Sequence, residues 1–352
     1  MLKNQKIIFS DNKLNYSHNA LFNLVILLGF SYYYIGYVGL FSYLIAFIGI
    51  KYVFKINELL ILIYLLSYLI ISLLFADFIT VITSFRYHFG FLIFYFYFRS
   101  FNSNINFKHF FIFILSLTII EMFLINTIID PRLMPNYPEY DYINNFSTHF
   151  NFDWQRVYGF AANSSILSTH LIVIFSIINL KLFILPLFFT ILLIGSGTGL
   201  VVFVIYLLTY LKENILKYLF LIFPILIIIS LLFYNSNDFF FIFNKIFSLN
   251  FYTLIDTKIF FLKNFFSTDL EYIFFGNINE NIGGDFAWAS MLTSHGLLSF
   301  IIINIFMLSK CNKENIFPIL LLILTSYHYY TIFSLPGQIL TGYILAYRKY
   351  NS

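Results

Sequence analysis

The sequence has little charge and almost no cysteine. Only 10% of its 352 residues are charged, whereas a soluble domain has about 25%. Hydrophobic residues make up 60% of the chain and the mean hydropathy is +0.85, so too few polar side chains remain to cover a folded surface in water. A bilayer supplies the missing apolar solvent. We therefore expect an all-α polytopic membrane protein, with residues 1–352 forming one integral membrane domain.

The sequence lacks the residue patterns of disulfides, metal sites and nucleotide-binding sites. The single cysteine, Cys311, cannot form an intramolecular disulfide, and there is no CxxC pattern. No two histidines have the spacing of metal ligands on one helix face, so we expect neither a metal nor a cofactor. No Walker motif or glycine-rich phosphate loop appears, which argues against direct use of ATP. The net charge is only +4, and we expect no nucleic-acid partner.

Apolar runs predict about twelve membrane spans. A helix needs about 20 apolar residues to cross a bilayer. The first run follows a basic segment and has no small-residue cleavage site after it, so we interpret it as a retained signal anchor. The predicted spans are 20–35, 37–50, 57–76, 79–98, 107–129, 163–180, 182–195, 199–211, 218–234, 288–308 and two more within 316–347.

Basic residues predict the orientation of these spans. Clusters of Lys and Arg fall on alternate loops, which together hold 14 of the 20 Lys and Arg residues. Because basic loops stay in the cytoplasm, both termini are predicted to be cytoplasmic. The two long polar segments, at about 130–158 and 235–286, then both face outward from the bacterial cytoplasmic membrane.

Charged residues inside or beside the spans are candidates for function, because burying an ion in a membrane is costly. Arg86, with His88, lies near the outer end of the fourth span, and Glu121 lies within the fifth. Arg86 either has a function or simply extends its charged group to the outer membrane surface. Glu121 either has a function or pairs with a neighbouring helix.

Arg156 lies at the end of the first outer segment, just before the sixth span. Its planar guanidinium suits a phosphate, because it donates two parallel hydrogen bonds. Gly159 and the small residues 161–165 let a ligand or a helix approach closely. The alternative is that Arg156 is an interfacial anchor.

Asp285 lies at the start of the tenth span, after the flexible pair Gly283–Gly284. A carboxylate in this position can act as a general base, or it can cap the helix. His170 and His295 are interpreted as helix–helix hydrogen bonds. The GSGTG turn at 195–199 is interpreted as a tight turn or a helix-packing site, since it lacks the lysine of a phosphate loop.

Four features together resemble the O-antigen polymerase and O-antigen ligase superfamily, and within it the Wzy-type polymerases. They are Arg156 to Gly159 followed by Asn163, the span ending LLIGSGTG, the run FFGNINENIGGDFAWASMLTSHGLLSF, and the two long outward segments. The spacing from Asp285 to Gly296 resembles the ligase run, in which a His holds the first position. Asp in that place is more similar to a polymerase.

The resemblance implies polymerisation of undecaprenyl-diphosphate-linked glycans at the outer face of the cytoplasmic membrane. Arg86 and Arg156 are then the cations for the diphosphate, Asp285 is the base, and Lys263, Asn163 and His88 bind substrate. The expected partners are the lipid-linked glycans, membrane lipid, a flippase and a chain-length regulator. Three alternatives stay open: a ligase that transfers the glycan to the lipid A core, a lipid-linked glycan flippase, and a structural membrane protein.

Overall fold

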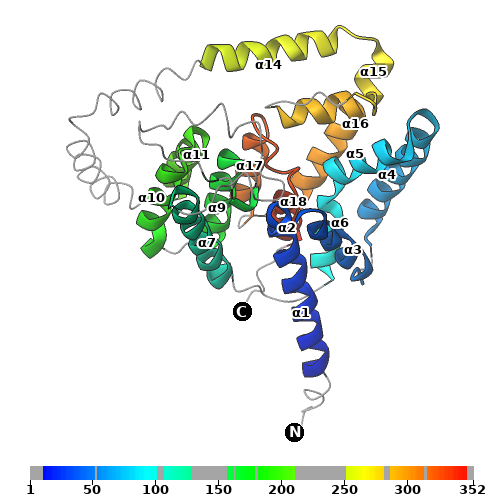
Figure 1. The fold of residues 1–352 in the computed structure, drawn as a ribbon. Coiled ribbons are helices and arrows are strands. Elements are labelled where there is room, and N and C mark those ends of the chain that lie inside the picture. Colours follow the sequence, from blue (N-terminus) through cyan, green and yellow to red (C-terminus); the bar gives the residue numbers. More distant parts are fainter. Residues whose placement is uncertain are drawn as a thin grey trace, which may run out of the picture.

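The computed structural model describes residues 11–51, 54–100, 107–127, 157, 159–161, 163–178, 181–210, 251–280, 286–312 and 315–346. All regular elements in these ranges are helices, which confirms the all-α expectation (Figure 1). In chain order they are α1 (Asp11–Phe30), α2 (Tyr32–Ile35), the 3-10 helix η1 (Gly36–Leu40), α3 (Phe41–Ile48), α4 (Ile56–Phe75), α5 (Phe78–Phe89), α6 (Phe91–Arg99), α7 (Phe107–Thr127), η3 (Gly159–Ala161), α9 (Ser164–Ile178), η4 (Lys181–Phe183), α10 (Ile184–Ile194), α11 (Gly197–Tyr210), α14 (Phe251–Phe266), α15 (Leu270–Phe275), α16 (Ala287–Ser309), α17 (Ile316–Thr325) and α18 (Leu335–Ala346).

Three helices in the described ranges are long and apolar enough to cross a membrane: α4, the part of α7 from Lys108 to Ile125, and α16. Two bent pairs also pass as units, Ala20–Phe30 with Tyr32–Ile48 at 68°, and α5 with α6 at 55°. The described part therefore holds three to five candidate membrane-crossing helices. The predicted span 218–234 lies outside the described residues, as do residues 130–156 of the first polar segment and residues 235–250 and 281–285 of the second.

Where the apolar run is uninterrupted, the helix bounds follow the prediction closely. The span predicted at 57–76 is α4, and the span predicted at 288–308 is α16. Residues 20–50 differ, because the chain bends at Ser31 rather than breaking only near Gly36. Gly36 has a φ of 64°, which favours glycine, and it begins the short 3-10 helix η1.

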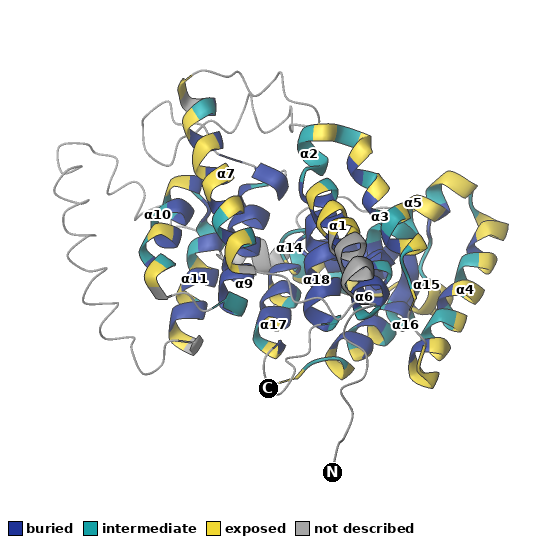
Figure 2. Cartoon of the chain, turned by 90° about the horizontal axis from the view of Figure 1, so that it is seen from below, coloured by how far each residue is buried: buried dark blue, intermediate teal, exposed yellow. Residues whose placement is uncertain are grey.

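Two helices form the centre of the bundle. Every residue of α9 from Ser164 to Ser176 is buried, and so is every residue of α18 from Leu335 to Leu345. Helix α4 lies at the periphery of the bundle (Figure 2). In its most apolar stretch 17% of the residues are buried, compared with 56% in that of α16. The side chains that α4 exposes are mainly large and apolar, which suits contact with lipid tails.

At one end of the bundle, the segments that carry Lys51 and Lys310 contact neighbouring helix ends. The Nζ of Lys310 at the end of α16 forms an ion pair with Glu58 at the start of α4, at 2.7 Å. The backbone N–H of Lys51, after α3, donates to the hydroxyl of Ser100, after α6, at 2.9 Å. The stretch from Lys51 to Glu58 takes part in both contacts, so these four segments lie at the same end of the bundle.

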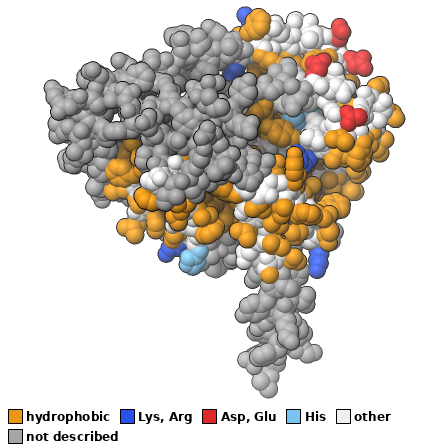
Figure 3. All heavy atoms as spheres, viewed as in Figure 1, with side chains coloured by type: hydrophobic (Ala, Val, Ile, Leu, Met, Phe, Trp, Pro, Cys, Tyr) orange, Lys and Arg blue, Asp and Glu red, His pale blue; other side chains and the backbone are white. Residues whose placement is uncertain are grey.

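The opposite end carries the described part of the second polar segment. Helix α15 lies there, and Asn279 Nδ2 donates to the main-chain oxygen of Phe75 at the far end of α4, at 3.4 Å. Figure 1 shows α14 and α15 on the side of the bundle opposite to the start of α1. In Figure 3, acidic side chains gather at this end, and an apolar surface covers the middle of the molecule.

Candidate functional site

Arg86 lies in the last turn of α5, half-buried, beside four tyrosines. Its charge is close enough to the hydroxyls of Tyr33 and Tyr43 to interact with them electrostatically. Tyr87 interacts in the same way with Tyr33, Tyr43 and Tyr330, and its ring packs edge-on against Tyr330 with the centroids 5.4 Å apart. We call these five residues the Arg86–tyrosine cluster. The carboxylates of the described residues form no ion pair with Arg86.

Gln338 of α18 fixes the backbone that carries this cluster. The 55° bend between α5 and α6 falls at Gly90, whose N–H still donates to the main-chain oxygen of Arg86 at 3.1 Å. The Nε2 of Gln338 donates to the main-chain oxygens of Arg86 at 3.0 Å and Tyr87 at 2.7 Å, and its Oε1 accepts from the Tyr43 hydroxyl at 2.7 Å. Exposed carbonyls in an apolar interior need such partners, so Gln338 stabilises the bend.

Glycine at position 90 is required by this contact. A Cβ there would lie 2.1 Å from the Oε1 of Gln338 and 2.8 Å from the ring of Tyr43. The bend and the amide therefore form one tightly packed unit, and it holds Arg86 at a defined position in the bundle.

A second buried contact lies on the other side of α2. The carboxylate of Glu121 on α7 accepts a hydrogen bond from the hydroxyl of Tyr34 and another, at 3.1 Å, from the backbone N–H of Gly159. Glu121 is 6% exposed. These bonds join α7, α2 and η3, and they confirm that Glu121 pairs with neighbouring segments.

Gly159 adopts a φ of 55° as its backbone turns toward Glu121. A Cβ at this position would lie 2.8 Å from the side chain of Leu167 on α9. Both the conformation and the space therefore require glycine here. Arg156, three residues earlier, lies outside the described residues.

Helix α2 interacts with both regions predicted to supply cations. Tyr33 interacts electrostatically with Arg86, and the next residue, Tyr34, is bonded to the carboxylate that holds Gly159. A guanidinium among several hydroxyl donors can bind a phosphate, since each group donates to an anionic oxygen. This arrangement could accommodate an anionic group between Arg86 and the segment that follows Arg156.

A buried histidine pair begins two residues after Arg86, at His88 of α5. The Nδ1 of His88 is 3.1 Å from the main-chain oxygen of Ser84 and 3.0 Å from the Nε2 of His295 on α16. His88 Nε2 is 3.2 Å from the hydroxyl of Ser290, and His295 Nε2 is 2.9 Å from that of Ser84. The helix–helix interpretation of His295 is confirmed. Both nitrogens of His88 contact protein groups, and its binding to substrate stays a prediction.

The contacts assign the proton on one histidine of the pair. A carbonyl oxygen only accepts, so His88 Nδ1 carries a proton toward Ser84. The Nδ1 of His295 is buried and has no partner among the described residues.

Next to this pair, α15 docks on a kink in α16. Gly296 interrupts α16 with a φ of 72° and a ψ of 174°. A Cβ on Gly296 would lie 2.2 Å from the main-chain oxygen of Phe274, and one on Gly276 would lie 2.5 Å from the nitrogen of Gly296. Tyr68 of α4 donates to the main-chain oxygen of Phe275 at 2.7 Å. We call the close approach of α15 to α16 at Gly276 and Gly296 the Gly276–Gly296 clasp.

Further bonds close the loop between these glycines. The backbone N–H of Asn277 donates to the oxygen of Thr293 at 2.6 Å, and the Ser294 hydroxyl donates to the oxygen of Glu280 at 2.9 Å. Glu280 also accepts from the hydroxyl of Tyr272, and burial together with this carboxylate raises the pKa of the Tyr272 phenol. Asp285 belongs to this loop in sequence, directly before Phe286, and lies outside the described residues.

The remaining predicted residues have separate positions. Asn163 caps the start of α9, where its Oδ1 accepts from the backbone N–H of Ser165 at 2.8 Å. Lys263 is exposed on α14 at the end of the bundle that carries α15. The structure does not bring either of them into contact with the Arg86–tyrosine cluster.

The GSGTG turn is a helix-packing site, as predicted. Gly195 ends α10 in the left-handed conformation, and the hydroxyl of Ser196 donates to that of Ser165 on α9 at 3.0 Å. A Cβ on Gly199 would lie 2.3 Å from the hydroxyl of Ser168. His170 also makes the expected contact between segments, since its Nε2 lies 2.9 Å from the main-chain oxygen of Thr331.

Two features of the site were absent from the sequence-based set of residues. One is Gln338, and the other is the group of tyrosines around Arg86. A polar amide within the apolar run of α18 is a usable signal, because uncompensated polar groups are costly there. The tyrosines carry no such signal, since 28 tyrosines are spread along the chain.

Searches of family models, curated proteins and solved structures give no match to this chain. Among the described residues, no group of three or more His, Cys, Asp or Glu side chains could hold a metal ion. The functional assignment therefore depends on the residues themselves.

Proposed function

We propose that this protein polymerises undecaprenyl-diphosphate-linked oligosaccharide repeats at the outer face of the bacterial cytoplasmic membrane. Its product is an O-antigen or a capsular polysaccharide. A flippase that delivers the repeats and a regulator of chain length are the expected protein partners.

The reaction is a glycosyl transfer. A hydroxyl of the non-reducing sugar on the incoming repeat attacks the anomeric carbon that links the growing chain to its lipid diphosphate. The carbon–oxygen bond to the diphosphate breaks, a glycosidic carbon–oxygen bond forms, and undecaprenyl diphosphate leaves. Asp285 takes the proton of the hydroxyl, and Arg86 and Arg156 stabilise the negative charge of the leaving group.

One observation carries this proposal. Tyr33 of α2 interacts electrostatically with Arg86, and the next residue, Tyr34, is joined through Glu121 to the backbone of Gly159, in the segment after Arg156. Arg86 is half-buried, and the carboxylates of the described residues form no ion pair with it. A diphosphate needs more than one cation, and this arrangement favours two arginines on one ligand.

The proposal includes twelve spans with both termini in the cytoplasm and segments 130–158 and 235–286 outside. The meeting of Lys51, Ser100, Glu58 and Lys310 at the end of the bundle opposite α15 supports this orientation. Reporter fusions after Asn144 and Asn279 should show an outside location, and a fusion after Asn214 should show a cytoplasmic one.

Deletion of the gene tests the function itself. We expect single repeat units on the lipid carrier or the core and a loss of long chains, with recovery when the wild-type gene is returned. Long chains that persist on the carrier, with only attachment to the core lost, would indicate a ligase. Repeats that stay at the cytoplasmic face would indicate a flippase.

A further inference from the structure

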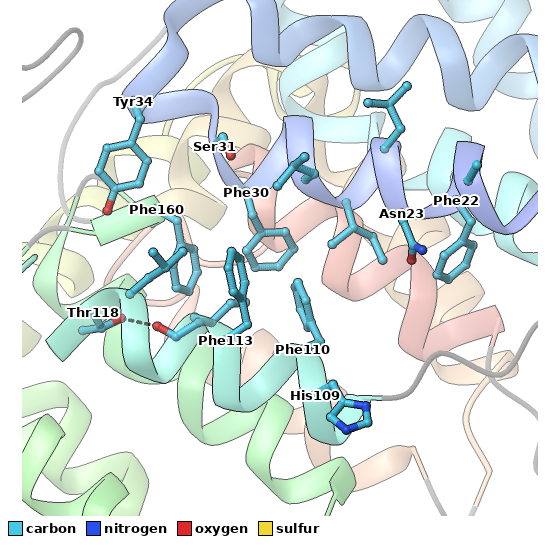
Figure 4. Close-up of a pocket in the computed structure, with 16 residues that line it drawn as sticks. Phe22, Asn23, Phe30, Ser31, Tyr34, His109, Phe110, Phe113, Thr118 and Phe160 are labelled. Atoms are coloured by element: carbon cyan, nitrogen blue, oxygen red, sulfur yellow. Dashed lines mark hydrogen bonds between the residues drawn. The ribbon is translucent and has the colours of Figure 1, made fainter. Parts of the chain in front are cut away.

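A largely apolar groove runs between α1 and α7 and has a volume of about 750 Å³ (Figure 4). Its floor consists of buried side chains, among them Phe22, Phe30, Ile114 and Phe160. Its rim is open, because Leu27 is 52% exposed and Phe113 is 49% exposed. Both helices belong to candidate membrane spans, so the open side faces lipid.

The two ends of the groove differ. At one end lie Asn23 of α1 and His109 in the first turn of α7. At the other end lie Tyr34 of α2 and Phe160 of η3. Figure 4 shows the phenylalanine rings between these two ends, so the groove is polar only near its limits.

The second end leads to the candidate site. Tyr34 bonds to Glu121, and Phe160 directly follows Gly159, whose N–H bonds to the same carboxylate. The residue before Tyr34 is Tyr33, which lies beside Arg86. A chain in the groove would therefore place its terminal group at the elements that carry the predicted diphosphate site.

We propose that the groove holds the polyprenyl chain of the lipid-linked substrate, with the diphosphate lying toward Arg86. This inference depends on the proposed function for the identity of the lipid. The volume of the groove falls in the range of roughly 300–1,000 Å³ that is typical of small-molecule sites. Membrane lipid is the competing occupant, and the continuity with the Arg86–tyrosine cluster favours a lipid whose head group is a diphosphate.

Packing, rather than the hydrophobic effect, holds the chain in place. Lipid tails are as apolar as the groove, so no apolar surface leaves water when the chain binds. Selectivity then depends on contacts with the aromatic floor and on the head group. Narrowing the groove at Leu27 should weaken binding of a long polyprenyl diphosphate more than binding of a short one, whose chain occupies only the end of the groove next to Tyr34.

Binding of undecaprenyl diphosphate and of geranyl diphosphate to purified full-length protein in nanodiscs tests this inference. Leu27→Trp fills the rim, Leu27→Ala opens it, and Ile63→Trp places the same bulk on the lipid-facing side of α4, where Ile63 is 51% exposed. We expect Leu27→Trp to weaken undecaprenyl diphosphate binding by about tenfold or more, and geranyl diphosphate binding to stay the same. Ile63→Trp should retain both affinities, and Leu27→Ala, which removes packing contacts without narrowing the groove, should weaken undecaprenyl diphosphate binding less than Leu27→Trp does.

Equal affinity of the wild type and Leu27→Trp for undecaprenyl diphosphate would overturn the inference. So would co-purified phospholipid in the groove that undecaprenyl diphosphate does not displace. A parallel loss of both affinities in Leu27→Trp, with a lower melting temperature, would show damage to the fold, and Phe113→Trp on the opposite rim then decides. These results are separate from the proposed function, which fails if deletion of the gene leaves chain length unchanged.

Discussion

The side-chain amide of Gln338 donates a hydrogen bond to the main-chain carbonyl of Arg86, 252 residues away in sequence, at 3.0 Å. The same Nε2 is within bonding distance of the oxygens of Tyr87 and Phe333. One buried amide therefore stabilises the bend at Gly90 and positions the half-buried arginine that the proposed reaction requires.

Gln338→Glu should destabilise the protein, because it keeps the shape of the side chain and removes the amide donor. The Arg86 carbonyl keeps the Gly90 N–H as a donor, and losing the bonds to the Tyr87 and Phe333 carbonyls costs about 1–3 kcal/mol. A lower melting temperature in detergent and a loss of long polysaccharide chains are the expected results. Thr341→Val is the matched control on the same helix, since the Thr341 hydroxyl is buried and has no partner among the described residues. Equal melting temperatures for the two variants would contradict the role of Gln338.

Gly296→Ala should open the Gly276–Gly296 clasp. An alanine at a φ of 72° is strained by about 1–3 kcal/mol, and its Cβ would lie 2.2 Å from the Phe274 oxygen. We expect α15 to separate from α16, which proteolysis of segment 266–286 in the purified protein can detect. Ile305→Ala, at an exposed position of α16, serves as the control. If both variants are cleaved at the wild-type rate, the clasp does not hold this loop.

Arg86→Ala and Arg156→Ala should both abolish polymer formation while the protein stays in the membrane. Arg86→Lys and Arg156→Lys should retain little activity, because a point charge lacks the fork geometry of guanidinium. Lys263→Ala should have a smaller effect, since Lys263 is exposed on α14. Gel analysis of chain length is the measurement. Full activity in Arg156→Lys would indicate an anchoring role, and a normal chain-length distribution in Arg86→Ala would remove Arg86 from the site.

Asp285→Asn should lose turnover and still bind lipid-linked donor. A general base typically accelerates such an attack by about 10²–10⁴-fold, and asparagine cannot take the proton. The alternative is that Asp285 caps α16, and asparagine caps a helix nearly as well as aspartate. Wild-type levels of polymer from Asp285→Asn would therefore exclude it as the base and leave Asp269 or Glu271 as the next candidates.

The sequence predicts the long helices of this fold better than its bends. Helices α4 and α16 follow uninterrupted apolar runs, so their bounds agree with the prediction within one residue at each end. The bend at Gly90 was missed, because residues 79–98 form a nearly continuous apolar run. A tertiary contact stabilises it, since the carbonyls of Arg86 and Tyr87 accept from an amide on a helix far along the chain.

The candidate site is predictable in part for the same reason. Arg86 and Glu121 were found because a charge within an apolar run is costly wherever it occurs. The contacts that surround them, from Tyr33 to Arg86 and from Tyr34 to Glu121, join segments far apart in sequence. No local spacing encodes such contacts, and the pairing of His88 with His295 is a further case.

The most direct test is reconstitution of the purified protein in liposomes with lipid-linked repeats extracted from the deletion strain of its own host. The account predicts a ladder of chain lengths and release of undecaprenyl diphosphate in the absence of ATP, with neither product from Arg86→Ala. A correctly folded wild-type protein that forms no ladder, or an Arg86→Ala variant that forms the same ladder, would contradict it.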